Sequence, residues 1–189
     1  MVLGWEGRIK AHNRVFGTTL DAIVQNTVCD ITLLCRPPAR DLEIARVLVP
    51  VSNIKYALLS LKTAVALVKD KSTRIVLFHA TYHDDLAGIK KKYVDELQKY
   101  AKEIDPKRFQ VIIKKTNRME EAIFAEAQNH DLIIMGAPEE GLVRRALFGD
   151  IPVNIAQKID APLILTKRYD GNVKSWFQKF FGSRKTMLE

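Results

Sequence analysis

Cysteine is scarce in this chain: Cys29 and Cys35 are the only two in 189 residues. No Cys-x-x-Cys pair and no histidine at ligand spacing accompanies them, so the sequence carries neither a zinc pattern nor a disulfide framework. A signal-peptide pattern is absent, and Lys62 interrupts the apolar run Ala57–Val68, which leaves no membrane-spanning segment. These absences predict a cytoplasmic chain with two small buried cysteines in a reducing compartment.

Catalytic patterns are absent as well. No Ser/His/Asp or Cys/His arrangement emerges from the four histidines, so we predict a non-enzymatic protein with no catalytic residue and no metal site. Positive charge, by contrast, is abundant: 30 Lys and Arg against 22 Asp and Glu give a formal charge of +8. This excess favours acidic partners, but only Tyr93 stands near the basic cluster 90–92, so no nucleic acid is expected.

Apolar runs alternate with amphipathic segments over most of the chain. Strands are expected at 46–51, 74–80, 109–115, 131–136 and 161–167, with helices at 53–70, 84–103, 119–128 and 143–159 between them. Unbroken apolar strands between helices are typical of a parallel sheet that is covered on both faces. The predicted fold class is therefore α/β, an open five-stranded parallel sheet with helices on both faces.

The sequence also contains a partial internal repeat. Adding 132 to the residue number carries Gly4 onto Gly136 and Gly17 onto Gly149 without a gap. We therefore expect residues 1–35 to be the C-terminal part of a first repeat, 36–45 a linker, 46–168 a complete repeat and 169–189 a basic amphipathic tail. The last strands of the two copies, Cys29–Leu34 and Ala161–Thr166, are expected to pair with each other or with a second chain, giving a pseudo-dimer or a homodimer.

Glycines at the end of a strand and at the start of the next helix let backbone N–H groups approach an anion closely. In the first copy, Gly4, Gly7 and Gly17 precede Thr18 with intervals of two and nine residues between the glycines. This pattern resembles that of the universal stress protein family, whose ATP-binding members carry the same spacing before Ser or Thr. The resemblance covers 46–168 and the end of a domain in 1–35, and it implies a five-stranded parallel sheet, adenine-nucleotide binding in some members and pairing through the last strand.

The complete repeat departs from the family motif. Gly136 and Gly149 keep their separation, but Glu139 stands at the middle glycine position and Asp150 at the hydroxyl position. The family's first strand usually ends in Pro-x-Asp, and here Pro50 is followed by Ser52 in place of the acid. The resemblance thus implies two sets of candidate nucleotide-binding residues: Gly4, Gly7, Gly17 and Thr18 in the first repeat, and, in degraded form, Pro50, Ser52, His79, Gly136, Gly149 and Asp150 in the second.

The negative charges of Glu139 and Asp150 oppose the binding of a phosphate group. A carboxylate about 4 Å from a phosphate charge repels it by roughly 4 kcal/mol at an effective dielectric constant near 20, and Glu139 and Asp150 supply two such carboxylates. We therefore expect weak or absent ATP binding in the complete repeat. A magnesium ion held by Asp150 would reverse the effect, so no cofactor is certain, and ATP or AMP with Mg²⁺ is the candidate ligand.

The tail places four aromatic side chains on one helical stripe, beside lysines. Such a stripe can dock on the chain's own helices, on a partner or on an anionic membrane surface. The arrangement resembles the cytoplasmic extension of some amino-acid permeases and cation transporters. We expect a regulatory or sensor module at the inner face of the membrane, bound to a parent transporter; the alternative is a free-standing ATP-binding stress protein with slow or no hydrolysis. The stripe consists of Trp176, Phe177, Phe180 and Phe181.

Overall fold

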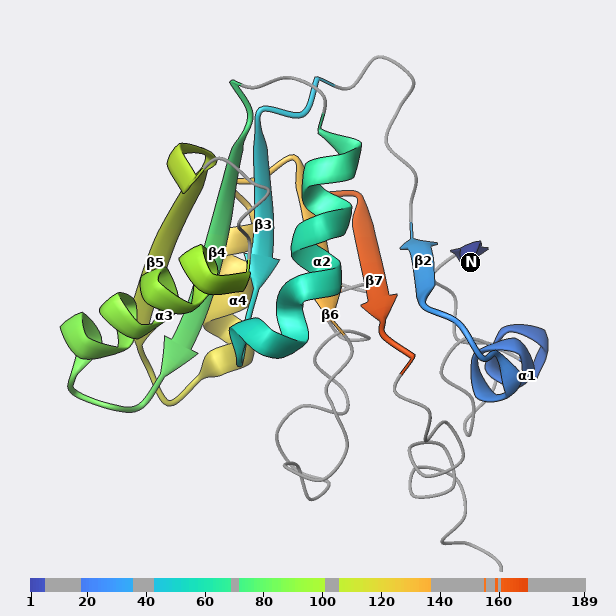
Figure 1. The fold of residues 1–189 in the computed structure, drawn as a ribbon, viewed down its shortest axis with the longest axis horizontal. Helices are drawn as coiled ribbons and strands as arrows, with labels where there is room; N and C mark the ends of the chain where they lie inside the picture. The colour runs from blue at the N-terminus through green and yellow to red at the C-terminus, as the bar shows by residue number, and fades with distance from the viewer. Residues whose placement is uncertain are drawn as a thin grey trace, which may run out of the picture.

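The computed structural model describes residues 1–5, 18–35, 43–68, 72–100, 106–136, 155, 159 and 161–169 (Figure 1). Its strands and helices follow the alternation that the apolar runs predict. They are β1 (Val2–Trp5), α1 (Thr18–Asn26), β2 (Ile31–Cys35), β3 (Arg46–Pro50), α2 (Ile54–Leu67), β4 (Arg74–Thr81), α3 (Leu86–Tyr100), a 3₁₀ turn (Pro106–Arg108), β5 (Phe109–Lys115), α4 (Met119–Ala127), β6 (Leu132–Gly136) and β7 (Leu163–Lys167).

The strands form one mixed sheet of seven strands in the order β1-β2-β7-β6-β3-β4-β5. The prediction of five strands was wrong for the whole sheet, although β3 to β7 are five strands that pair in parallel. The two further strands come from the N-terminal segment: β1 pairs in parallel with β2, and β2 pairs antiparallel with β7. β2 and β7 thus pair within one chain, with Leu33 opposite Leu165.

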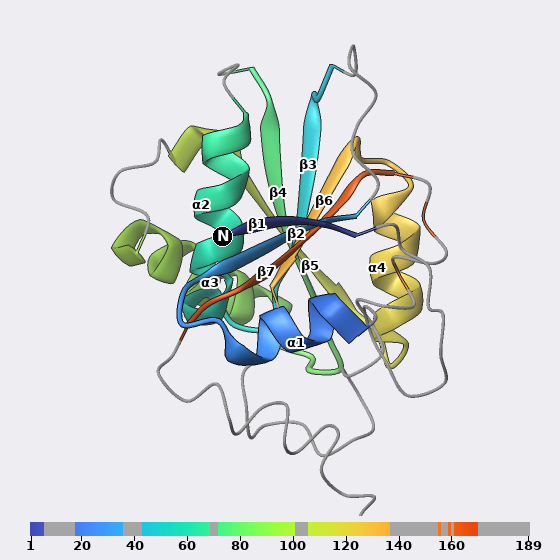
Figure 2. The same cartoon turned by 90° about the vertical axis from the view of Figure 1, so that its right-hand side faces the viewer.

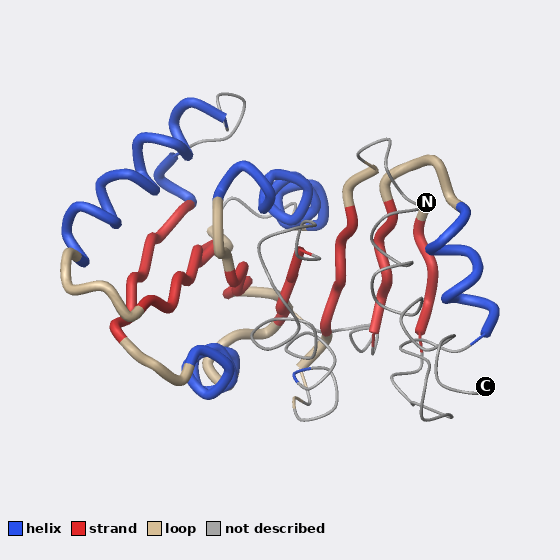
Figure 3. Tube along the Cα trace, turned by 90° about the horizontal axis from the view of Figure 1, so that it is seen from below, coloured by secondary structure: helices blue, strands red, loops and turns tan. Residues whose placement is uncertain are grey.

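Helices cover both faces of the parallel part of the sheet, as the views of Figures 1 and 3 show. Successive side chains of a strand point to opposite faces, so two apolar layers form. On one face, Phe78 and Ile133 pack with Ile123 of α4. On the other, Leu77 and Ile134 pack with Leu61 of α2. Burial on both faces explains why these strands read as continuous apolar runs.

The N-terminal segment shares the core of the complete repeat. Trp5 and Leu33 are buried in the same cluster as Phe78 and Ile133, and Figure 2 shows α1 beside β1 and β2 at this end of the sheet. Cys35 is also buried there, as predicted. The same prediction was wrong for Cys29, which is exposed because it lies in the turn that precedes β2.

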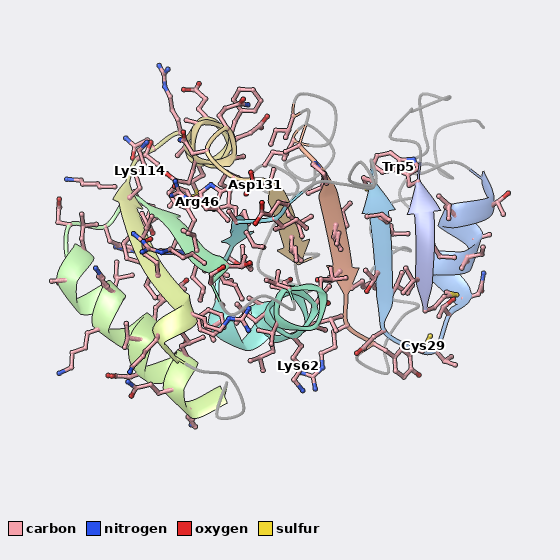
Figure 4. All side chains as sticks on the ribbon, turned by 90° about the horizontal axis from the view of Figure 1, so that it is seen from above. Trp5, Cys29, Arg46, Lys62, Lys114 and Asp131 are labelled. Carbon is pink, nitrogen blue, oxygen red and sulfur yellow. The ribbon has the colours of Figure 1, made fainter. Side chains whose placement is uncertain are left out.

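The amino ends of β3 and β6 are joined by a carboxylate. Asp131 Oδ2 accepts hydrogen bonds from the backbone N–H groups of Ala45 and Arg46, at 2.9 and 2.8 Å, and Figure 4 shows Arg46 and Asp131 close together. The Asp131 N–H in turn donates to the Arg46 carbonyl at 3.0 Å. These bonds fix the amino ends of β3 and β6 relative to each other.

Two predicted segments fall largely outside the described residues. Of the helix expected at 143–159, only Ile155 and Ile159 are described, and both are buried. The tail is described only to Tyr169, so its aromatic stripe is not among the described residues. None of the helices that the structure describes is long and apolar enough to cross a membrane.

Candidate functional site

The strand order reverses between β3 and β6. From β3 the chain adds β4 and β5 on one side, and then returns to add β6 and β7 on the other, with Leu48 opposite Ile133. In open α/β sheets, ligands bind outside the carboxyl ends of the strands at such a reversal. The candidate site is therefore the edge where β3 ends at Pro50 and β6 ends at Gly136, beside the end of β4 (Figure 1).

The loop between β3 and α2 is held against β4. The Val51 N–H donates to the Phe78 carbonyl at 2.9 Å, which extends the pairing of the two strands by one residue. Ser52 follows and is exposed, and α2 begins at Ile54. The side chain that the candidate site offers here is thus a hydroxyl with no charge, where the family's Pro-x-Asp pattern has a carboxylate.

His79 on β4 and Tyr93 on α3 hold this loop in place by hydrogen bonds. His79 Nδ1 lies 2.8 Å from the Val51 carbonyl oxygen and 2.9 Å from Tyr93 Oη. The Tyr93 hydroxyl donates to the Ser52 carbonyl at 2.7 Å, and the two ring centroids are 4.8 Å apart. Because a carbonyl oxygen only accepts, the hydrogen of a neutral His79 ring resides on Nδ1. We name His79, Tyr93 and the Val51 and Ser52 carbonyls the loop lock.

Burial keeps both side chains of the loop lock uncharged. It lowers the pKa of His79 below its ordinary value, and this effect outweighs the hydrogen bond to Val51, while nearby His83 lowers the pKa further. Burial also raises the pKa of Tyr93, and the charge of Glu96 adds to that rise. A neutral imidazole and a neutral phenol that both bond backbone carbonyls hold a loop in place. His79 Nδ1 and Tyr93 Oη are thus already hydrogen-bonded within the protein.

The glycines of the two copies do not meet at this edge. Gly136 is half-buried at the end of β6, whereas Gly4 is exposed in β1, in register with Leu34. β1 is parallel to β2 and β6 is parallel to β7, but β2 runs antiparallel to β7. β1 and β6 therefore point in opposite directions, so one ends where the other begins. Thr18 begins α1. The remaining candidates, Gly7, Gly17, Gly149 and Asp150, lie outside the described residues.

The loop lock contains a residue that the sequence interpretation missed as part of the site. The sequence pattern places Tyr93 only beside the basic cluster 90–92. Its spacing is the signal that could have placed it, because Ile89, Tyr93 and Leu97 recur every four residues and face the sheet. Across the described ranges, no three His, Cys, Asp or Glu side chains come together as metal ligands would.

A buried histidine, His130, makes the stability of the chain sensitive to acid. His130 is 5% exposed, and its Nδ1 lies 2.8 Å from the Glu126 carbonyl oxygen. Burial lowers its pKa, and the charge of Arg46 adds to the effect, against the opposing influence of the Glu126 carbonyl, Glu126 and Asp131. The unfolded chain therefore binds a proton near pH 6.5 that the folded chain does not yet bind.

We expect the free energy of unfolding to fall as pH decreases below 6.5, by up to about 1.4 kcal/mol per pH unit for His130. Urea unfolding between pH 7.5 and 5.5 measures this slope. His130→Asn, which keeps an N–H group near the Nδ1 position, should reduce the slope and leave the part that His79 contributes. An equal slope in the unchanged chain and in His130→Asn would contradict the assignment.

Comparison with solved structures identifies the fold. The chain is similar to a universal stress protein from Archaeoglobus fulgidus, with a TM-score of 0.62 and 20% identity over 90% of this chain and 61% of that one. It is also similar to a Pseudomonas aeruginosa protein, with a TM-score of 0.54 and 11% identity over 96% of this chain and 67% of that one. The chain thus spans 61% of the length of the Archaeoglobus protein. These likenesses support the fold alone.

Comparison with sequences identifies the family. No curated protein is significantly similar to the chain. The model of the universal stress protein family matches residues 43–167, which include β3 to β7 and the candidate site. This range is more than half of the chain, so the chain belongs to the universal stress protein family.

Proposed function

We propose that this protein is a non-enzymatic regulatory module whose complete repeat binds adenine nucleotide weakly or not at all. The observation that carries the proposal is the exposed Ser52 at the end of β3, where the family pattern has an acid. A hydroxyl with no charge makes a weaker hydrogen bond to a ligand than a carboxylate does. In the sequence, Glu139 and Asp150 follow β6 at the motif positions of a glycine and a hydroxyl residue, and carboxylates there repel a phosphate group.

The loop lock gives the candidate site a fixed loop conformation. His79 and Tyr93 are the ionisable side chains that bond the loop after β3, and both are directed to backbone carbonyls. Both side chains thereby fix the conformation of this loop, which suits a binding or regulatory site.

The proposal also includes a membrane partner. The stripe of Trp176, Phe177, Phe180 and Phe181 in the sequence, next to lysines, supports docking on an anionic membrane surface or on the membrane domain of a parent transporter. The formal charge of +8 favours the same partners. In this proposal the universal stress protein fold supplies a regulatory unit on the cytoplasmic side of the transporter.

Repair of the motif tests the proposal. A variant with Ser52→Asp, Glu139→Gly and Asp150→Ser restores the family pattern and is expected to bind Mg-ATP at least about tenfold more tightly than the unchanged chain, because two repulsive carboxylates are removed. Isothermal titration calorimetry measures both affinities. Glu43→Gln changes the net charge by the same amount just before β3, at the opposite end of the strands, and is the matched control. Equal affinities of the repaired and unchanged chains would contradict the proposal.

A further inference from the structure

Three exposed apolar side chains lie together at one end of β1, β2 and β7. Val28 follows α1 and is 72% exposed, and Tyr169 follows β7 and is 37% exposed. Val2 begins β1, in register with Thr32 near the start of β2, and is 74% exposed. We name Val2, Val28 and Tyr169 the apolar end. A single exposed apolar residue is ordinary, but a group of them at one place indicates a contact surface.

The segments that form the apolar end are tied to each other. Ile31 of β2 lies opposite Lys167 of β7, so the turn before β2 and the residues after β7 share one end of the sheet. Here Asp30 Oδ1 accepts the Tyr169 N–H at 2.8 Å. Figure 4 shows Cys29, in the same turn, at the start of β2 and beside the end of β7. The apolar end is therefore a fixed part of the folded chain.

The remaining described residues form no second group of this kind. Of the other large apolar side chains that they expose, Met1 adjoins the apolar end, whereas Leu67 and Tyr82 lie apart from it. Tyr82 follows β4, which β6 and β3 separate from β7. Leu67 ends α2 next to Val68, whose carbonyl accepts a hydrogen bond from Arg108 just before β5. Leu67 therefore lies at the opposite end of the parallel strands.

Basic residues accompany the apolar end. Arg168, next to Tyr169, is exposed, and the carboxylate of Asp30 is engaged by the Tyr169 N–H. Downstream, the sequence 173–185 contains four basic residues and no acidic residue, together with the aromatic stripe of the tail. Anionic lipid headgroups attract Lys and Arg that lie close to the membrane surface. Apolar surface and positive charge thus occur side by side, which is the combination that interfacial membrane-binding elements use.

The form of the apolar end favours a bilayer over a protein partner. Its side chains come from a turn and from the ends of two strands, and not from a helix face or a groove. A stable protein interface needs a broad complementary surface, about 800 Å² on each partner. Apolar side chains can instead enter the headgroup layer of a membrane singly, and tyrosine is favoured there because its ring is apolar and its hydroxyl is polar.

We propose that the apolar end enters the headgroup layer of an anionic membrane beside the tail. Val28 and Tyr169 supply apolar contact together with Val2, and Arg168 and the basic residues of the tail supply the charge. This inference rests on the membrane partner of the proposed function, and it adds the surface of the folded part that meets the lipid. With two contacts, the tail and the apolar end, the fold has one orientation on the membrane, whereas the tail alone would leave it free to turn.

Cys29 reports on this contact directly. It is exposed in the turn beside Val28, whereas Cys35 is buried, so a thiol-reactive, environment-sensitive dye labels Cys29 in the folded chain. With vesicles of equal parts phosphatidylcholine and phosphatidylglycerol, the dye emission should shift to shorter wavelength, and phosphatidylcholine alone should give no shift. A dye that is already shifted without vesicles would mean that a second copy or the tail covers the apolar end, and would overturn the inference.

Two variants that add the same charge at opposite ends complete the test. Val28→Asp should weaken co-sedimentation of the unlabelled chain with the anionic vesicles about tenfold, because a carboxylate replaces an apolar side chain in the headgroup layer. Leu67→Asp, at a position that is 50% exposed, should bind like the unchanged chain.

The failure of the inference differs from the failure of the proposed function. Equal binding of the unchanged chain, Val28→Asp and Leu67→Asp, with an unshifted Cys29 dye, would overturn the inference and leave the tail as the membrane contact. No binding of the unchanged chain to the anionic vesicles would contradict the membrane partner of the proposed function, and the inference with it.

Discussion

Leu165→Asp is expected to abolish the cooperative unfolding of the whole chain, whereas Leu33→Asp is expected to release only the N-terminal segment. The two leucines are buried register partners on β7 and β2, and both face the same apolar cluster. Each substitution removes about 2 kcal/mol of apolar burial and places a carboxylate in a core with no partner for it. The total cost exceeds about 4 kcal/mol, which is a large part of a domain's stability.

The difference between the two variants comes from the architecture. β7 belongs to the complete repeat and lies between β2 and β6, so its loss removes an inner strand. β2 connects only β1 to the rest of the sheet, so the complete repeat keeps all five of its parallel strands when β2 leaves.

Hydrogen exchange followed by mass spectrometry separates the two outcomes. In Leu33→Asp, protection should be lost in residues 1–5 and 18–35 and kept in β3, β4 and β6, while Leu165→Asp should lose protection throughout. Circular dichroism on the same samples reports the helices that remain. Complete unfolding of Leu33→Asp would contradict the account, because it would make the N-terminal segment an inseparable part of one folding unit.

Removal of the Tyr93 side chain should have the second large effect. Tyr93→Ala empties a buried aromatic site and breaks the hydrogen bond to Ser52, at an expected cost of about 3 to 5 kcal/mol in the free energy of unfolding. Tyr93→Phe removes only the hydroxyl and should cost about 1 to 2 kcal/mol, because the Ser52 carbonyl loses its donor. Urea unfolding at pH 7.5 measures both values.

The exposed Tyr82 provides the matched control for Tyr93. It lies at the same end of the sheet, just after β4, and stacks on His83 with 4.1 Å between the ring centroids. Tyr82→Phe should change the free energy of unfolding by less than about 0.5 kcal/mol, as surface substitutions usually do. A Tyr93→Phe value as small as that of Tyr82→Phe would show that the loop lock contributes nothing to stability.

The elements of the complete repeat could be predicted from local sequence. The strand expected at 109–115 has these bounds as β5, and the helix expected at 119–128 is α4, Met119–Ala127. The first segment is a short apolar run typical of a strand, and the second has apolar residues at helical spacing. Each pattern is local because each element packs against neighbours within residues 46–168. The predicted membership of the universal stress protein family is confirmed by the match to residues 43–167.

Two features depended on tertiary contacts that the sequence does not encode locally. In the seven-stranded sheet, β2 pairs with β7 of the same chain. The sequence does not predict this pairing, because an apolar edge strand can equally pair with a strand of a second chain. The loop lock requires the hydroxyl of Tyr93 to reach the Ser52 carbonyl, 41 positions away in the chain. A helical period places Tyr93 on the inner face of α3 but does not say which carbonyl its hydroxyl meets.

Titration of the unchanged chain with Mg-ATP tests the central claim most directly. That claim is that the complete repeat keeps the fold of the family at the ends of β3 and β6 but has lost its nucleotide site. Calorimetry should show no saturable binding below about 1 mM, equivalent to less than about 4 kcal/mol of binding free energy. Saturable binding at micromolar concentration, lost on Asp150→Ala, would contradict the claim and identify Asp150 as a magnesium ligand.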